Sequence, residues 1–393
     1  MHVHRLAPCR AVLFGTASAF SLLCSSVAWS ASQRVAQTNL VTDDAAFLAS
    51  QGFAPAATVD ASLINPWGTS FSATSPFWVS NQGAGNATLY NGAGAKQGLT
   101  VTMPSFPGGP NGPTGQVFNS TTNDFVLAAD GAKATFLFAN LNGAIQGWNN
   151  GLGTTAANAV LTPGAVYTGL ALGNSGGQNF LYAANVAQNR IDVFNSGFML
   201  TSLAGSFTDP TLPAGLAPFN VANIGGQLYV TYAPPQDADE APLGTGVVDV
   251  FNTDGTFVRR FATGGNLLSP WGVARAPASF GVFGNAILVG NFAEDDGFIN
   301  AFRESDGTYL GMLNGPGGDP FKMPYLWSLA FRTGGAGVDP NALYFTAGIG
   351  DEMHGLFGRL NAIPEPAAWA MMVAGFALAG WAVRKSRPQV VPG

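Results

Sequence analysis

Short apolar runs recur along this chain with a period of roughly 50 residues. Each is followed by a run in which apolar and polar residues alternate, the pattern of a half-buried strand. The apolar runs are residues 77–81, 136–140, 181–185, 228–232, 287–291 and 343–347. Each follows an aromatic residue, taken in order as Trp67, Phe118, Tyr167, Phe219, Trp271 and Trp327. A repeat of this length made only of strands is typical of propeller blades. The pattern therefore predicts an all-β fold, a six-bladed β-propeller over residues 31–362.

The last repeat is incomplete, because the composition changes at Ile363-Pro364 directly after its third strand. An open sheet edge presents unpaired backbone groups and invites association with other chains. The segment RVAQTNLVTD (34–43) precedes the first repeat and has no place within it. We expect this segment to supply the missing outer strand of the last blade and to close the ring.

The amino-terminal residues 1–30 have the features of a secretory signal peptide. Arg5 and Arg10 precede an apolar run from 11 to 23, and small residues follow at 28–30 as a cleavage site. Cys9 and Cys24 both lie within this segment. The mature body is therefore expected to have no disulfide and no thiolate metal site.

The carboxyl-terminal residues 363–388 predict a membrane segment, followed by a short tail at 389–393. Pro364, Glu365 and Pro366 precede an uncharged, mostly apolar stretch from 367 to 383, which is close to the shortest helix that crosses a bilayer. Positive charge holds the far end on the cytoplasmic side. That charge comes from Arg384, Lys385 and Arg387.

This order of Pro-Glu-Pro, apolar helix and basic end closely resembles the PEP-CTERM sorting signal of Gram-negative bacteria. The resemblance implies export through the Sec machinery, a transient anchor in the inner membrane and processing by an exosortase. It further implies a final location at the cell surface or outside the cell, in the extracellular matrix.

The body resembles NHL-type propeller repeats, best seen in LYAANVAQNRIDVF (181–194). It is also similar, nearly end to end, to an uncharacterised family of secreted bacterial propellers. The segments that carry this similarity include TNLVTD (38–43), INPWG (64–68), PTGQVFN (113–119), DVFNTDG (249–255) and LYFTAG (343–348). The similarity implies the fold and assigns no chemistry.

Composition narrows the function classes. The 393 residues carry a net charge of −6, and only 10% of them are charged. An acidic chain with few basic residues lacks the positive footprint that nucleic acid requires. We expect a monomer that meets the membrane only through its carboxyl-terminal helix.

Acidic residues gather between the second and third strands of the last three repeats. Oxygen ligands of this kind suit calcium, and a histidine nearby would admit a transition metal. The alternative is a solvated acidic rim. The candidate metal ligands are Glu294, Asp295, Asp296, Asp351, Glu352 and His354, and Asp237, Asp239 and Glu240 form a candidate ligand-binding loop.

Two repeated positions are further ligand-binding candidates. An asparagine ends the second strand in four repeats, as Asn81, Asn140, Asn185 and Asn291. Propeller lactonases use Asn and Glu around a channel metal, although asparagine is also a common turn residue. The tryptophans Trp67, Trp271 and Trp327 could line the channel mouth and stack on sugar rings, or could wedge between blades as core residues.

These features favour a binding module over an enzyme, with polysaccharide or a surface protein as partner. The alternative is a metal-dependent hydrolase of the propeller lactonase type centred on the acidic loops and His354. In a third possibility the propeller is only a spacer and the tail carries the biology. No nucleophile motif or phosphate-binding loop accompanies these residues.

Overall fold

The structure is a computed structural model that describes residues 32–107, 109–295 and 297–364. These residues form four four-stranded antiparallel sheets and one nine-stranded sheet. The predictions for the signal peptide (1–30) and for the carboxyl-terminal helix (367–383) lie outside the described residues. Within the described part, no helix is both long enough and apolar enough to cross a membrane.

The four-stranded sheets follow one another along the chain. The first two are β3 (Pro66–Ser70), β4 (Phe77–Asn81), β5 (Asn86–Tyr90) and β6 (Lys96–Thr102), then β7 (Pro113–Phe118), β8 (Phe136–Asn140), β9 (Ala144–Trp148) and β10 (Ala157–Leu161). The next two are β11 (Tyr167–Ser175), β12 (Gln178–Asn185), β13 (Arg190–Phe194) and β14 (Leu200–Thr201), then β15 (Ala217–Ile224), β16 (Gln227–Ala233), β17 (Val247–Asn252) and β18 (Phe257–Thr263). In every sheet consecutive strands are neighbours.

The nine-stranded sheet contains the remaining strands. Its order is β19 (Ser269–Arg275), β20 (Ile287–Phe292), β21 (Ile299–Phe302), β22 (Tyr309–Asn314), β1 (Gln33–Thr42), β25 (Leu356–Ala362), β24 (Ala342–Ala347) and β23 (Leu326–Ala330), while β2 (Thr58–Val59) pairs only with β1. Three short helices lie in connections: α1 (Ala45–Ser50), η1 (Asn150–Leu152) and η2 (Gly281–Phe283). Each of the six apolar runs lies in a strand, as predicted.

The strand β1 closes the fold as the sequence predicts. It runs antiparallel to β25 from Val35, opposite Ala362, to Thr42, opposite Leu356. At its start it also pairs in parallel with β22, where Gln33 is opposite Leu313. The first ordered strand of the body therefore covers the edge of the last one and links β22 to β25.

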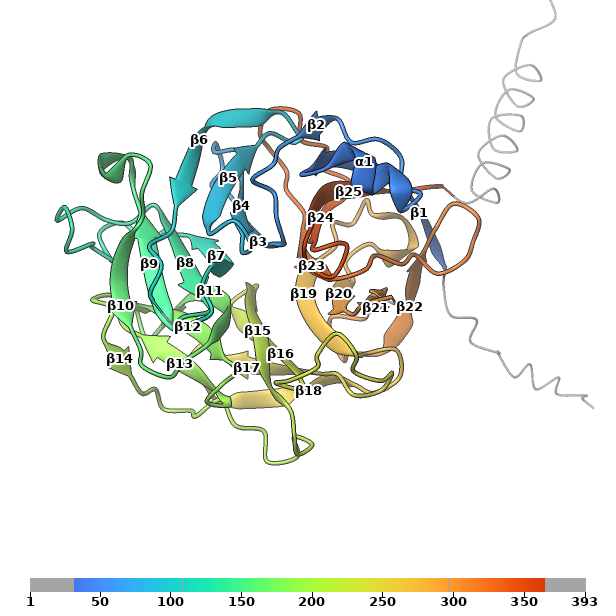
Figure 1. The fold of residues 1–393 in the computed structure, drawn as a ribbon. Helices are drawn as coiled ribbons and strands as arrows, with labels where there is room; N and C mark the ends of the chain where they lie inside the picture. Colours follow the sequence, from blue (N-terminus) through green and yellow to red (C-terminus); the bar gives the residue numbers. More distant parts are fainter. Residues whose placement is uncertain (1–31, 108, 296, 365–393) are drawn as a thin grey trace, which may run out of the picture. The chain divides into compact units, whose positions relative to one another are not determined.

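The sheets are arranged radially, with the inner strands β3, β7, β11, β15, β19 and β23 around the centre (Figure 1). Glycines let neighbouring inner strands come close. A Cβ on Gly68 would lie 2.6 Å from the carbonyl of Thr114, and one on Gly272 would lie 2.5 Å from that of Trp327. Such distances leave room only for glycine. This is the arrangement of a β-propeller.

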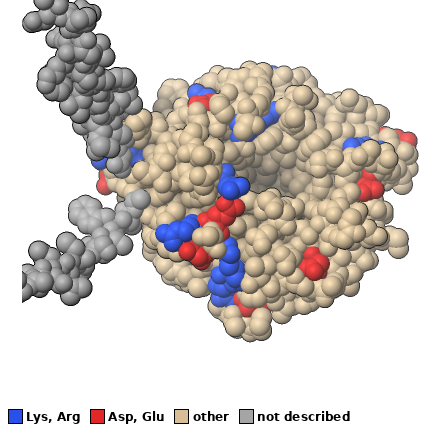
Figure 2. Space-filling model, turned by 180° about the vertical axis from the view of Figure 1, so that it is seen from behind, with Lys and Arg blue, Asp and Glu red and all other residues tan. Residues whose placement is uncertain are grey.

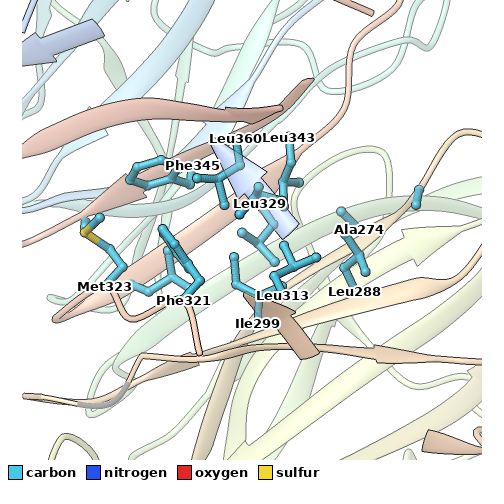
Figure 3. Close-up of a cluster of buried hydrophobic side chains, with 14 of the residues drawn as sticks. Ala274, Leu288, Ile299, Leu313, Phe321, Met323, Leu329, Leu343, Phe345 and Leu360 are labelled. Carbon is cyan, nitrogen blue, oxygen red and sulfur yellow. The ribbon is translucent and has the colours of Figure 1, made fainter. Parts of the chain in front are cut away.

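Hydrophobic clusters fill the spaces between adjacent sheets. Successive residues of a strand point to opposite faces, so Phe345 packs on the β19–β22 side while Tyr344 packs on the β3–β6 side. Figure 3 shows the first of these clusters, where Leu288 and Ile299 meet Leu343 and Phe345. Each such buried side chain stabilises the fold by about 1.5–3 kcal/mol.

Candidate functional site: the central channel

The inner strands enclose a channel, and three tryptophans close one end of it. The rings of Trp67 and Trp327 stack with centroids 3.6 Å apart, and Trp271 meets Trp327 edge-on at 5.6 Å. Phe292 stacks on the other side of Trp327 at 4.0 Å. We call Trp67, Trp271, Trp327, Phe219 and Phe292 the indole plug; with Tyr325 and Ala233 they form one buried cluster.

Hydrogen bonds fix two of the three indoles of the plug. Trp327 Nε1 donates to Asn65 Oδ1 at 3.0 Å, and Trp271 Nε1 donates across the channel to the carbonyl of Thr168 at 3.2 Å. The third indole nitrogen, that of Trp67, is buried without a partner. A buried donor left unpaired costs about 1–3 kcal/mol, so the plug has one polar defect.

The other end of the channel is a cavity of about 600 Å³. This volume is within the range of small-molecule sites. Six residues, one in or directly after each inner strand, lie on the rim of the cavity. Each comes four positions after the residue of that strand that is equivalent to Trp67, as Phe71 does for β3. These residues are Phe71, Phe118, Leu172, Asn223, Arg275 and Phe331, and we call them the mouth ring. Figure 2 shows a hollow near the middle of one face, bordered for most of its rim by uncharged residues.

Polar side chains inside the cavity bond to one another and to neighbouring strands. Gln116 Nε2 donates to the carbonyls of Gly68 and Trp78, and its Oε1 accepts from Ser70. Asn220 Nδ2 donates to the carbonyl of Trp271 at 2.7 Å. These bonds join successive inner strands around the axis. The cavity therefore contains uncharged polar groups, held by hydrogen bonds, among apolar side chains.

The structure corrects the register of the predicted aromatic series. Pro66 pairs with Asn81 and Pro113 pairs with Asn140, so Thr114, not Phe118, is the counterpart of Trp67. By the same comparison Tyr167 corresponds to Pro66, because it pairs with Asn185. The pairing with the second strand, and not the nearest aromatic residue, defines the equivalent positions. Phe118 belongs to the mouth ring.

The three tryptophans face one another across the axis. Trp67, Trp271 and Trp327 are 6%, 3% and 1% exposed. They are buried core residues that meet near the axis. Trp67 and Trp327 come from the neighbouring inner strands β3 and β23, and Trp67 also meets Trp271, from a non-adjacent inner strand, at 6.2 Å. Their place is the closed end of the channel, where Trp271 also lines the cavity.

The four asparagines are buried in the sheets. Asn81, Asn140, Asn185 and Asn291 are each at most 1% exposed. Asn185 Oδ1 accepts from the backbone of Val166 and Gln188, and Asn291 Oδ1 accepts from Leu268 N. These bonds hold the connections between sheets. The side chains do not line the cavity.

The acidic loops lie beyond the plug, away from the cavity. Asn65, which accepts from Trp327, donates its Nδ2 to Glu352 Oε1 at 2.8 Å. Tyr325 of the plug cluster donates to Asp351 Oδ1 at 3.1 Å. Glu294 N bonds to the carbonyl of Asp239, which joins the loops of two sheets. The face predicted to bind ligand is thus sealed from the channel.

Electrostatics show how close these acids are. The charge of Asp295 is the main cause that raises the pKa of Glu294, and Asp351, Glu240 and Asp239 add to it. Burial raises the pKa of Glu352, against the hydrogen bond from Asn65. Like charges that are close together destabilise one another. The loops form an acidic rim around the plug.

The candidate metal ligands do not assemble. In the part of the chain that the structure describes, no three His, Cys, Asp or Glu side chains form a group that could hold a metal ion. His354 Nδ1 is 2.7 Å from Asp43 Oδ2, and its ring stacks on Phe47 at 3.8 Å. Asp237 is exposed at the tip of its loop, and Asp296 is outside the described residues.

The sorting motif lies at the carboxyl end of the body. Ile363 N donates to the carbonyl of Arg34, so pairing with β1 continues up to Pro364. The other residues of the motif, Glu365, Pro366, Arg384, Lys385 and Arg387, lie outside the described residues. Residues 362–387 match the PEP-CTERM protein-sorting motif.

Two relatives from Acanthamoeba polyphaga mimivirus match most of this chain. Uncharacterized protein R648 is 31% identical over 330 residues, which span 80% of this chain and 79% of that protein. Uncharacterized protein L690 is 31% identical over 322 residues, 78% of this chain and 82% of that protein.

Solved structures resemble the chain more loosely. A streptogramin B lyase has 13% identity and a TM-score of 0.47, covering 84% of this chain and 97% of its own. The Dos1 propeller has 9% identity and a TM-score of 0.43, covering 79% and 70%. Similarity at this level carries no functional information.

Proposed function

This chain belongs to the same protein family as the uncharacterized proteins R648 and L690 of Acanthamoeba polyphaga mimivirus, and on that premise we propose that it is an exported, six-bladed propeller that binds a ligand in its channel. In this proposal the nine-stranded sheet counts as two blades, β19–β22 and β23–β25, joined by β1. The repeat of glycine contacts between inner strands supports the count.

The proposed route uses both ends of the chain. Residues 1–30 direct export through the Sec machinery, and residues 363–388 anchor the protein briefly in the inner membrane through an apolar helix. An exosortase then processes the tail, and the body of residues 31–362 remains at the cell surface or outside the cell. The match of residues 362–387 to the sorting motif supports this route.

The observation that carries the binding role is a channel open at one end only. The indole plug closes one end, and the cavity of about 600 Å³ opens at the other between the side chains of the mouth ring. A closed end excludes a ligand that threads through, so the ligand is a small molecule or the end of a chain. No described group of three metal-ligating side chains favours the lactonase alternative.

The test places a bulky ring at the entrance of the cavity. Ala222 lines the mouth and is partly buried, so Ala222→Trp blocks the entrance without removing a core side chain. Ala132, in an exposed turn, gives the matched control Ala132→Trp. Both full-length variants are produced in a strain that lacks the native protein. Their retention on the washed cell surface and extracellular matrix is then compared with wild type.

Retention should fall about tenfold or more in Ala222→Trp and stay unchanged in Ala132→Trp. Deletion of residues 363–393 serves as a second comparison, since it removes sorting and leaves the cavity. Equal retention of both tryptophan variants, with loss only on tail deletion, would show that the propeller is a spacer and would end the binding proposal.

A further inference from the structure

Arg332 is a buried cation without a carboxylate partner. It lies two residues after the end of β23 and is only 4% exposed. Its Nη2 donates to the carbonyls of Ser72 and Ser75 in the β3–β4 connection. Its Nε is buried with no partner, and no Asp or Glu forms an ion pair with it among the described residues. An uncompensated buried charge is costly.

Arg332 is the most deeply buried arginine in the part of the chain that the structure describes. Arg259 and Arg359 are partly buried and also have an Nε without a partner, whereas other arginines are paired with carboxylates. Arg260 contacts both Asp209 and Asp249, and Arg190 contacts Asp192 at 2.5 Å. Arg275, at the end of the neighbouring inner strand β19, is about half exposed and pairs with Glu304 at 2.9 Å. The chain is acidic, so a counter-charge was available by composition. Burial lowers the pKa of Arg332, which shows that its charge is penalised.

Arg332 is one of the residues that line a pocket of about 290 Å³. Its carbon Cζ lies 4.8 Å from the ring centre of Phe71 and 5.0 Å from that of Phe77. Phe71, Phe118 and Phe331 line both this pocket and the channel cavity, so the two spaces adjoin at these rings. An anionic group in the pocket would still lie beside a ligand that enters the channel.

Each of these three phenylalanines packs against another aromatic ring. Phe71 packs edge-on against Phe77 at 5.2 Å, and Phe331 against Phe280 at 5.0 Å. Phe118 contacts Phe136 at 5.5 Å. Each of the three remains partly exposed. Rigid rings with one open side bind flat or apolar parts of a ligand at little entropic cost.

We propose that this pocket binds the carboxylate of a small ligand, with Arg332 as its counter-ion and the ligand's apolar part against Phe71, Phe118 and Phe331. A carboxylate matches the planar fork of a guanidinium and forms charge-assisted hydrogen bonds with it. The inference rests on the proposed channel function and names the chemistry of the ligand that the channel takes.

Benzoate and benzamide test the inference, because they share a flat ring and differ in charge. The purified full-length protein is titrated with each at constant ionic strength, and binding is followed by ligand-observed NMR and by melting temperature. Benzoate should bind and raise the melting temperature, and benzamide should bind about tenfold or more weakly. Phenyl phosphate is the third probe, and binding stronger than benzoate's would overturn the carboxylate assignment.

Three variants locate the site. Arg332→Gln should abolish benzoate binding, and Arg303→Gln, which removes an arginine that is paired with Asp306 and lines neither pocket, should leave it unchanged. Because Arg332→Gln also loses the bonds to Ser72 and Ser75, Thr333→Glu provides a second route. Thr333 is exposed and lines the pocket, so a glutamate there should displace benzoate without unfolding the protein.

The inference is overturned when benzoate does not bind, or when it binds equally to wild type, Arg332→Gln and Thr333→Glu. Failure here is distinguishable from failure of the proposed function. If benzoate does not bind but Ala222→Trp reduces retention, only the assignment of a carboxylate ligand is rejected. Unchanged retention of Ala222→Trp rejects the channel function whatever benzoate does.

Discussion

Arg260 donates its Nε to the buried carboxylate of Asp249 at 2.7 Å, and its other end reaches Asp209. One guanidinium thus serves two acids. Burial raises the pKa of Asp249 to about 7, against the pull of Arg260 and with a contribution from Asp209. Burial would also raise the pKa of Asp209, but hydrogen bonds from Thr211 and Arg260 outweigh it and lower that pKa. The two acids therefore contribute to stability with opposite dependence on pH.

Asp249→Asn should change how stability depends on pH. Folded Asp249 holds its proton more tightly than the unfolded chain, in which an aspartate carboxyl has its ordinary pKa of 3.8. Its contribution to stability is therefore complete below pH 3.8 and is lost as the pH rises toward 7. We expect the free energy of unfolding of wild type, relative to Asp249→Asn, to fall by ~1–4 kcal/mol between about pH 4 and 8. Urea titration across this range measures it.

Asp130→Asn is the control for the pH experiment, because Asp130 is exposed in a turn. Its stability should run parallel to that of wild type. If the free energies of unfolding of wild type and Asp249→Asn differed by the same amount over the whole pH range, the raised pKa of buried Asp249 would be refuted. Below about pH 4 the free energy of unfolding should instead fall with decreasing pH, because the contribution of Asp209 is lost as the pH falls.

Gly272→Ala tests the close approach of inner strands. The added Cβ would meet the carbonyl of Trp327 at 2.5 Å, and neither backbone can move without disturbing the plug. We expect a loss of about 1–3 kcal/mol of stability. Gly98→Ala is the matched control, since a Cβ there meets nothing within 4 Å. Similar melting temperatures for the two variants would contradict the tight inner ring.

Leu40→Ala tests closure by β1. Leu40 is 2% exposed and packs with Tyr344 and Phe357 between the first and last sheets. Its truncation should cost about 2–5 kcal/mol in denaturant titration. Thr38→Ala, on the exposed side of the same strand, should change stability by less than about 0.5 kcal/mol. Equal losses would mean that β1 does not seal the body.

Trp327→Phe and Trp67→Phe compare two indoles of one stack. Both keep most of the ring area, but only Trp327→Phe removes a hydrogen bond, the one to Asn65 at 3.0 Å. Trp67 Nε1 has no partner to lose. We expect Trp327→Phe to be less stable than Trp67→Phe by about 1–3 kcal/mol. The reverse order would contradict the hydrogen bonding of the plug.

Local patterns predict the strands well and the site poorly. The apolar run 77–81 and its equivalents could be predicted as strands, because the hydrophobic pattern that indicates a strand extends over only a few neighbouring residues. The site depends on register instead. The repeat pattern groups Phe118 with Trp67, whereas the pairing of Pro66 with Asn81 and of Pro113 with Asn140 places Phe118 four positions after the counterpart of Trp67, in the mouth ring. The true counterpart, Thr114, is signalled by the repeated Pro-x-Gly of 66–68 and 113–115.

The sequence by itself determined the repeat of strands, the closing role of β1 and the sorting motif. The strands and the motif depend on neighbouring residues, and the role of β1 follows from the strand that is missing in the last repeat. The tertiary structure alone decided which end of the channel is open. Trp67, Trp271 and Trp327 lie far apart in the chain and meet only when the sheets close around one axis. Where they converge, they close the end of the channel at the acidic loops, so the cavity opens at the opposite end.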